Sequence, residues 1–166
     1  MAVKEILLLG NPKLYEISEP VQENEVGDLS SVVEDLHDTM ADFKRKYGAG
    51  RAIASPQIDV MKRLLYMHID EPTVFINPVL EFSGAEMIEV WDDCMCFPDL
   101  LIKVQRHKHC TIRYKDMDWQ DRNMELVDDL SELLQHEYDH LDGILAVSRA
   151  IDGKSFALKS QREKAK

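Results

Sequence analysis

The sequence predicts an α+β fold in which antiparallel β-sheets wrap around one central helix. Short runs of β-branched and aromatic residues, separated by turn residues, fill the chain between residues 64 and 114. A long helical pattern follows them, in which Leu126, Leu130, Leu133, Leu134 and Leu141 recur at helical spacing, Asp128 or Asp129 can cap the start and Gly143 can end it. The 166 residues suffice for a single domain over residues 1–166 and are too few for two ordinary ones.

Local patterns place the other elements in chain order. Residues 1–10 carry a short apolar run that predicts a first strand rather than a signal peptide. A 3-4-3 apolar stripe predicts a helix that begins at Ser30 or Ser31 and ends at Gly48. A polar turn is expected at residues 116–123, and a terminal helix at 154–166. Strands are expected at residues 64–69, 74–76, 79–82, 87–91, 100–104 and 110–114.

The charge balance argues against several classes of function. Asp and Glu number 31 against 20 Lys and Arg, which gives a formal net charge of −11. Nucleic acids and anionic membranes are bound by basic patches, so neither is an expected partner. No apolar run approaches the roughly 20 residues that span a bilayer. The three cysteines do not make a disulfide framework and fit a reducing compartment.

The predicted central helix carries a metal-binding pattern, because residues 136–140 read H-E-Y-D-H. Histidines four residues apart, here His136 and His140, lie on one face of a helix and can hold one metal ion. The carboxylate of Glu137 can reach a water on that metal and act as a general base. The pattern therefore predicts a metal-dependent hydrolytic site.

A catalytic metal site needs a third protein ligand and an open position for water. The longer pattern with a further histidine fails, because Ala146 stands at that position, and the only downstream glutamate is Glu163 in a charged tail. Cysteine is the remaining candidate, since a thiolate binds zinc or ferrous iron well. Cys110 lies in a predicted strand and is typical of core packing. The residues alone leave Cys94 and Cys96 as alternatives.

Three segments together resemble the motifs of the peptide deformylase family, G-x-G-L-A-A-x-Q, E-G-C-L-S and H-E-x-D-H. Residues 50–57, 92–96 and 136–140 match them in this order, the first two with substitutions. Residues 11–14, 18–21 and 75–78 are also similar to family segments, so the resemblance covers most of the chain. It implies the family's fold and hydrolysis of the N-formyl group from the N-terminal methionine of newly made polypeptides, which releases formate.

The resemblance assigns the metal ligands and the general base. Cys94, His136 and His140 would hold one divalent metal ion, usually ferrous iron, for which zinc or nickel can substitute. Glu137 would take a proton from the attacking water and return it to the leaving amine.

Further site residues follow from the same resemblance. The side-chain amide of Gln57 and the backbone N–H of Met95 would stabilise the oxyanion. Arg106 would pair with the acidic residue two positions before the metal cysteine. The residues expected to contact substrate are Gly50, Ile53, Val90, Asp92 and Leu133.

Several positions depart from the family pattern. Asp92 replaces a glutamate, and Asp93 replaces a glycine, which adds a negative charge beside the metal cysteine and implies a different backbone angle. Cys96 replaces a serine. Glu132, with Asp129 near it, stands one turn before the first histidine, where family members often place apolar residues that line the methionine pocket. A solvated pair at the pocket rim and a pocket tuned to another N-formyl group are the two interpretations.

The function favoured by the sequence is therefore metal-dependent deformylation in a bacterial cytoplasm. An N-formyl-methionyl peptide is the expected substrate, and its origin implies a transient encounter with ribosomes. The alternatives are a deformylase-like hydrolase of another N-formyl substrate, a zinc endopeptidase and a family relative without catalysis. Retention of Glu137, Gln57 and all three ligand candidates favours a catalyst.

Overall fold

A computed structural model describes residues 2–164, in which eight strands form two antiparallel sheets. The larger sheet contains, in spatial order, β1 (Ala52–Ala54), β2 (Leu64–His68), β3 (Pro72–Phe82), β6 (His109–Lys115) and β7 (Asp121–Val127). The smaller sheet contains β4 (Met87–Asp92), β5 (Leu100–His107) and β8 (Phe156–Leu158).

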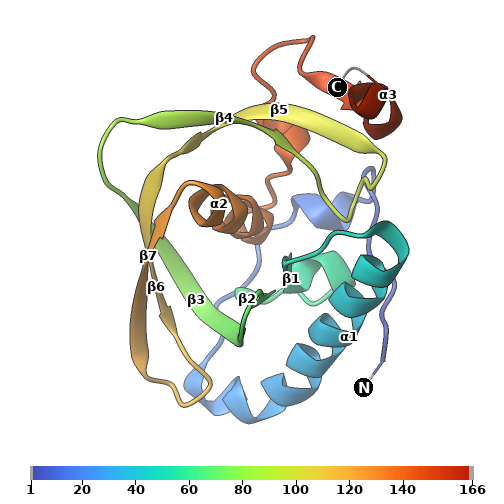
Figure 1. Cartoon of the computed structure of the whole chain (residues 1–166). Coiled ribbons are helices and arrows are strands. Elements are labelled where there is room, and N and C mark those ends of the chain that lie inside the picture. The colour runs from blue at the N-terminus through green and yellow to red at the C-terminus, as the bar shows by residue number, and fades with distance from the viewer. Residues whose placement is uncertain (1, 165–166) are drawn as a thin grey trace.

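Three α-helices accompany the sheets in the described part of the chain. They are α1 (Leu29–Tyr47), α2 (Asp129–Leu141) and α3 (Lys159–Lys164). Helix α2 lies between the two sheets, and α1 packs outside β1 and β2 (Figure 1). The predicted arrangement, antiparallel sheets around a central helix, is confirmed. Short 3-10 helices connect the elements at Pro12–Tyr15, Glu23–Asp28, Ser55–Ile58 and Ala146–Arg149.

Helix α1 confirms the expected start and stop to within two residues. It begins at Leu29, and Gly48 follows its last residue with φ +75, a left-handed conformation that suits glycine. The N–H of Gly48 donates to the carbonyl of Lys44 at 2.8 Å and closes the last turn. No helix among residues 2–164 is long and apolar enough to cross a membrane.

Helix α2 is buried on most of its circumference. Leu134 and Leu141 pack into the core of the larger sheet, together with Phe75 and Ile112. The other buried residues of this helix are polar: Ser131, Gln135, His136, Glu137, Asp139 and His140. Buried polar groups need partners, so the environment of this helix determines the geometry of the site.

The expected first strand is wrong, because the N-terminal segment belongs to neither sheet. Residues 2–9 run extended across the molecule without strand pairing. The N–H of Leu7 donates to the carbonyl of Gln57 at 2.8 Å, and the N–H of Leu9 donates to the carbonyl of Cys96 at 2.9 Å. The apolar run therefore connects two loops instead of extending a sheet.

The expected polar turn at residues 116–123 is too long, since strand β7 begins at Asp121. Leu126, which was expected in the central helix, lies in this strand and pairs with Cys110 of β6. The strand has few apolar residues because most of its side chains are exposed. Asp128 then turns the chain with φ +52, and its side chain makes no capping bond to α2.

The strands expected at residues 74–76 and 79–82 form one continuous strand, β3. The terminal helix expected at residues 154–166 is shorter in the structure. Strand β3 continues through Asn77, which has φ +48 and bonds both backbone groups of Val21 with its side chain. A register shift between Ile76 and Val79 accommodates this irregularity. At the C-terminus, β8 pairs with β5 before the six-residue helix α3. Residues 165–166 of the expected helix lie outside the described chain.

Replacing Gly143 with alanine is expected to lower the free energy of unfolding by at least about 2 kcal/mol. Gly143 has φ +70, and a Cβ atom there would overlap the backbone carbonyl of Tyr15. Urea denaturation would measure the change. The control is Gly48→Ala, which has a similar φ of +75 but open space around the new carbon, so only about 1 kcal/mol of conformational strain is expected. Equal effects of the two variants would contradict the predicted overlap.

Candidate active site

Three metal-ligating side chains converge in the interior. The ligand atoms of Cys94, His136 and His140 all lie within 4.8 Å of one another. The Sγ of Cys94 is 3.4 Å from Nε2 of His140. Cys94 follows β4, whereas both histidines project from α2. Within residues 2–164 this group includes neither Cys96 nor Glu163, so the geometry selects Cys94 from the alternatives that the sequence left open.

The protonation states that burial favours in Cys94 and His140 make this group suitable for binding a cation. Burial lowers the pKa of His140 well below its usual value, so the imidazole is in the neutral form that binds metals. Burial raises the pKa of the Cys94 thiol, so a nearby cation is needed to keep the sulfur as a thiolate. The Nδ1 of His140 and Oε2 of Glu137 are buried without a hydrogen-bond partner among the described residues. One thiol and two imidazoles fit a divalent ion such as zinc or ferrous iron.

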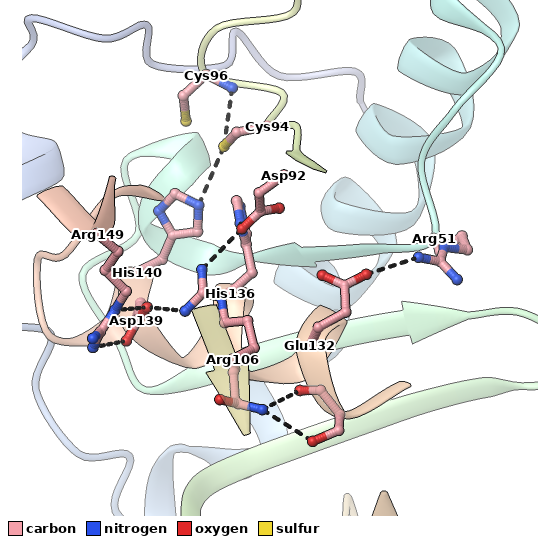
Figure 2. A network of polar contacts seen from close by, with 12 residues as sticks. Arg51, Asp92, Cys94, Cys96, Arg106, Glu132, His136, Asp139, His140 and Arg149 are labelled. Atoms are coloured by element: carbon pink, nitrogen blue, oxygen red, sulfur yellow. Dashed lines mark hydrogen bonds and ion pairs between the residues drawn. The ribbon is translucent and has the colours of Figure 1, made fainter. Parts of the chain in front are cut away.

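A buried ion-pair network orients His136 (Figure 2). Its Nδ1 is 2.8 Å from Oδ2 of Asp92, which leaves Nε2 for the metal group. Arg106 donates to the same carboxylate oxygen at 2.9 Å, so the expected contact between Arg106 and Asp92 is present. Burial disfavours the charged carboxylate of Asp92, but His136 and Arg106 outweigh this effect and lower its pKa.

The same network reaches two residues that the sequence did not identify. Arg106 donates from Nη1 to Oδ2 of Asp139 at 2.6 Å. Arg149 adds two hydrogen bonds to this carboxylate, from Nε at 2.6 Å and from Nη2 at 2.8 Å. Asp139 lies inside the H-E-x-D-H segment, which was the available signal. Nothing in the local sequence points to Arg149.

Replacing Arg106 with methionine is expected to lower the free energy of unfolding by about 3 to 5 kcal/mol. Its side chain is only 3% exposed, and its loss would leave Asp92 and Asp139 buried with fewer charge partners. The matched control is Arg149→Met, which loses a pair to the same Asp139 from a side chain that is 43% exposed. The control substitution should lower the free energy of unfolding by only about 1 kcal/mol. Urea denaturation would measure the free energy of unfolding of both variants. Equal decreases would show that burial of the Arg106 guanidinium does not determine its contribution to stability.

A pocket of about 210 Å³ opens beside the metal group. Glu137 lines it next to His136, and burial raises the pKa of Glu137 to about 7 despite the opposing charge of His136. Three of the residues expected to contact substrate also line the pocket: Gly50, Asp92 and Leu133.

The other two expected substrate contacts lie elsewhere. Ile53 is fully buried in the core beneath α1. Its neighbour Ala52 lines the pocket, and successive side chains of a strand point to opposite faces. Val90 packs against the core of the smaller sheet, which includes Val104. Neither Ile53 nor Val90 is therefore among the residues that line this pocket.

The two expected oxyanion donors belong to residues near the cysteine, since Gln57 contacts its sulfur and Met95 follows it in the chain. Oε1 of Gln57 accepts a hydrogen bond from the N–H of Ala54 at 2.8 Å, which directs Nε2 towards the sulfur atoms. That nitrogen is 3.8 Å from Sγ of Cys94 and 3.5 Å from Sγ of Cys96. Gln57 is buried behind the pocket wall, whereas Met95 lines the pocket directly.

Comparison with known proteins agrees with this geometry. The sequence matches the family described as Polypeptide deformylase over residues 3–156. The chain belongs to the polypeptide deformylase family. The peptide deformylase of Pseudothermotoga lettingae is 32% identical over 160 residues, which cover 96% of this chain and 90% of the relative. Peptide deformylase 1 of Prochlorococcus marinus is 34% identical over 177 residues, which cover 99% of this chain and 90% of the relative.

A solved structure shows the same fold. The crystal structure of peptide deformylase from Thermotoga maritima matches with a TM-score of 0.83 at 25% identity, and the match covers 92% of this chain and all of that one (100%). The family is metal-dependent, and the group formed by Cys94, His136 and His140 could hold a metal ion here. Nothing in these similarities favours a zinc endopeptidase or a relative without catalysis.

Two departures from the family pattern are accommodated in the loop after β4. Asp93 is not among the residues with a positive φ, so its backbone is free of left-handed strain. Its carboxylate is 51% exposed and lies 3.7 Å from Nζ of Lys159, which offsets its charge. Cys96 is buried, and its N–H points to Sγ of Cys94 at 3.4 Å.

Proposed function

We propose that Cys94, His136 and His140 hold one divalent metal ion and that Glu137 handles the protons of the family's reaction. That reaction is hydrolysis of the N-formyl group from the N-terminal methionine of nascent polypeptides, and the chain is a metallohydrolase of this type. The observation that carries the proposal is the convergence of a buried thiol and two imidazoles within 4.8 Å, beside a pocket that contains Glu137.

The resemblance to the family favours ferrous iron as the native metal, with zinc or nickel able to substitute. A thiolate and two imidazoles suit each of these borderline ions, so the donor set is compatible with all three. When bound, the metal would act as a Lewis acid and lower the pKa of its water to about 7.

Glu137 carries the proton between water and the leaving group. Its Oε2 is buried without a hydrogen-bond partner in the described chain, so this oxygen is available to a ligand in the pocket. It accepts a proton as water attacks the formyl carbon and then donates that proton to the departing amine nitrogen. The products are formate and a free amine.

Gln57 and Met95 stabilise the negative charge that develops on the formyl oxygen. The bond from Ala54 fixes the Gln57 amide with its NH₂ group towards Cys94. The backbone N–H of Met95 follows the cysteine at the pocket wall. Neutral donors fixed in advance suit a tetrahedral oxyanion.

Replacing Gln57 with leucine is expected to lower kcat by about 100- to 1,000-fold, with a small change in KM, because one oxyanion donor is lost. Steady-state kinetics on formyl-Met-Ala-Ser would measure this loss. Gln105→Leu, on the exposed side of β5, is the control for the substitution itself. Since Gln57 also bonds Ala54, the unfolding midpoint must be measured for both variants. A folded Gln57→Leu protein with less than tenfold loss would contradict the donor role.

Formate release from formyl-Met-Ala-Ser tests the function directly. Protein loaded with ferrous iron under anaerobic conditions should turn the peptide over, and a chelator should abolish turnover. Metal-loaded protein that releases no formate would refute the proposal.

The substrate also indicates where the protein works. Nascent peptides with a formyl group are made in the bacterial cytoplasm, so we infer a cytoplasmic location and a transient encounter with ribosomes. The net charge of −11 argues against direct binding to ribosomal RNA.

A further inference from the structure

The pocket beside the metal group contains a second carboxylate of α2 that is largely shielded from solvent. Glu132 lies on α2 one turn before His136, lines the same pocket as Glu137, and has a side chain only 15% exposed. Arg51, which immediately precedes β1, approaches it from across the pocket (Figure 2). The Nη2 of Arg51 is 3.8 Å from Oε1 of Glu132, which is an ion pair but too long for a hydrogen bond.

Arg51 is shared between two carboxylates. Its Nη1 pairs more closely with Oδ2 of Asp129, whose side chain is 68% exposed. One guanidinium therefore faces two acidic groups, and the trio has a net negative charge. Within residues 2–164, no side chain donates a hydrogen bond to the carboxylate of Glu132. Burial, followed by the charge of Asp92, raises the pKa of Glu132 to about 7 even though His136 and Arg51 oppose the shift.

Two other acidic groups that line the pocket, Asp92 and Asp93, have counter-charges. Asp92 accepts from Arg106 and contacts His136. Asp93 lies 3.7 Å from Nζ of Lys159. Apart from Glu137, which the proposed reaction uses, Glu132 is thus the pocket carboxylate whose only ion-pair partner among the described residues is an arginine shared with a second acid.

The apolar part of the lining defines the shape of the matching ligand. Phe43 of α1 and Leu133 of α2 line the pocket together with Glu132. An extended side chain with an apolar stem and a cationic end would place its methylene groups against Phe43 and Leu133. Its charge would then meet the carboxylate of Glu132, and such a pair satisfies a buried charge that is otherwise costly.

We propose that Glu132 determines specificity by favouring N-formyl substrates whose first side chain ends in a cation over uncharged side chains of equal length. The proposal rests on the proposed function and extends its substrate class from formyl-methionine to formyl-lysine-like compounds. The interpretation of Glu132 and Asp129 as a solvated pair applies only to Asp129, because Glu132 is largely buried.

Two substrates that differ only at the end of the side chain test the proposal. The ratio of kcat/KM for formyl-Lys-Ala-Ser to that for formyl-norleucine-Ala-Ser should exceed one in the natural sequence. Glu132→Gln should lower this ratio by about 10- to 100-fold, the range expected for loss of a charge-assisted hydrogen bond. The control Glu125→Gln removes the same charge from an exposed position on β7 and should leave the ratio unchanged.

Binding separates failure of this proposal from failure of the deformylase function. Calorimetry on metal-loaded protein compares the product peptides Lys-Ala-Ser and norleucine-Ala-Ser. If no formyl peptide is hydrolysed but Glu132→Gln still abolishes a binding preference for lysine, the specificity role stands and the deformylase role fails. If formyl-norleucine peptide is hydrolysed and Glu132→Gln leaves the ratio unchanged, or if binding shows no preference for lysine, the specificity role is overturned.

Discussion

Replacing Glu137 with glutamine is expected to lower kcat/KM for formyl-Met-Ala-Ser by about 100- to 10,000-fold, the range attributed to general acid–base catalysis. Glutamine keeps the size of the side chain but cannot accept and return a proton. Glu137 is buried beside His136, and its Oε2 has no partner among the described residues. The neutral amide therefore introduces no unpaired charge, so folding should be preserved. Formate release and metal content, measured on the same preparation, would test both expectations.

Glu125→Gln serves again as the control, because it makes the same chemical change at an exposed position. Its kcat/KM should match that of the natural sequence. A Glu137→Gln protein that retains its metal and more than a tenth of its activity would show that another group moves the proton.

Replacing Cys94 with alanine is expected to remove both metal and activity. The variant loses the only sulfur in the ligand group, leaving His136 and His140 alone. A site that loses a ligand binds its metal far more weakly, so metal content should fall from about one ion per chain to a small fraction after dialysis. Metal analysis under anaerobic conditions and formate release would measure the two losses.

The neighbouring cysteine gives the matched control. Cys96→Ser restores the residue of the family motif, and the Cys96 sulfur lies outside the ligand group. This variant should keep its metal and most of its activity. A Cys94→Ala protein with full metal content would instead indicate a ligand set without sulfur, as a zinc endopeptidase requires.

The sequence predicts the central helix and the metal group because both depend on local patterns. The spacing of His136 and His140 needs only helical geometry, and the motif containing Cys94 lies in a short turn. The smaller sheet is harder to predict, because β8 has three residues and obtains its stability from pairing with β5. Strand β7 is likewise difficult to predict from the sequence, because all of its residues except Met124 and Leu126 are exposed and it lacks a clear apolar pattern.

The remaining parts of the site depend on tertiary packing. Ile53 follows Ala52 in a three-residue strand whose side chains are all buried, so no alternation in the sequence shows which one faces the pocket. Arg149 reaches Asp139 from a separate 3-10 helix after the end of α2. The pairing of Arg51 with Glu132 joins positions 81 apart in the chain (132 − 51). Such contacts become visible only when the elements are assembled.

The N-terminal segment affects how the protein can be handled in the laboratory. Its backbone spans from the loop of Gln57 to the loop of Cys96, using the N–H groups of Leu7 and Leu9. These loops carry Gln57 and Cys96, both of which contact Cys94. Truncation of the first nine residues would release both anchors at once and loosen the catalytic scaffold. An affinity tag fused before Met1 would sit only a few residues from the first of these anchors, so a tagless preparation is the appropriate reference for kinetic measurements.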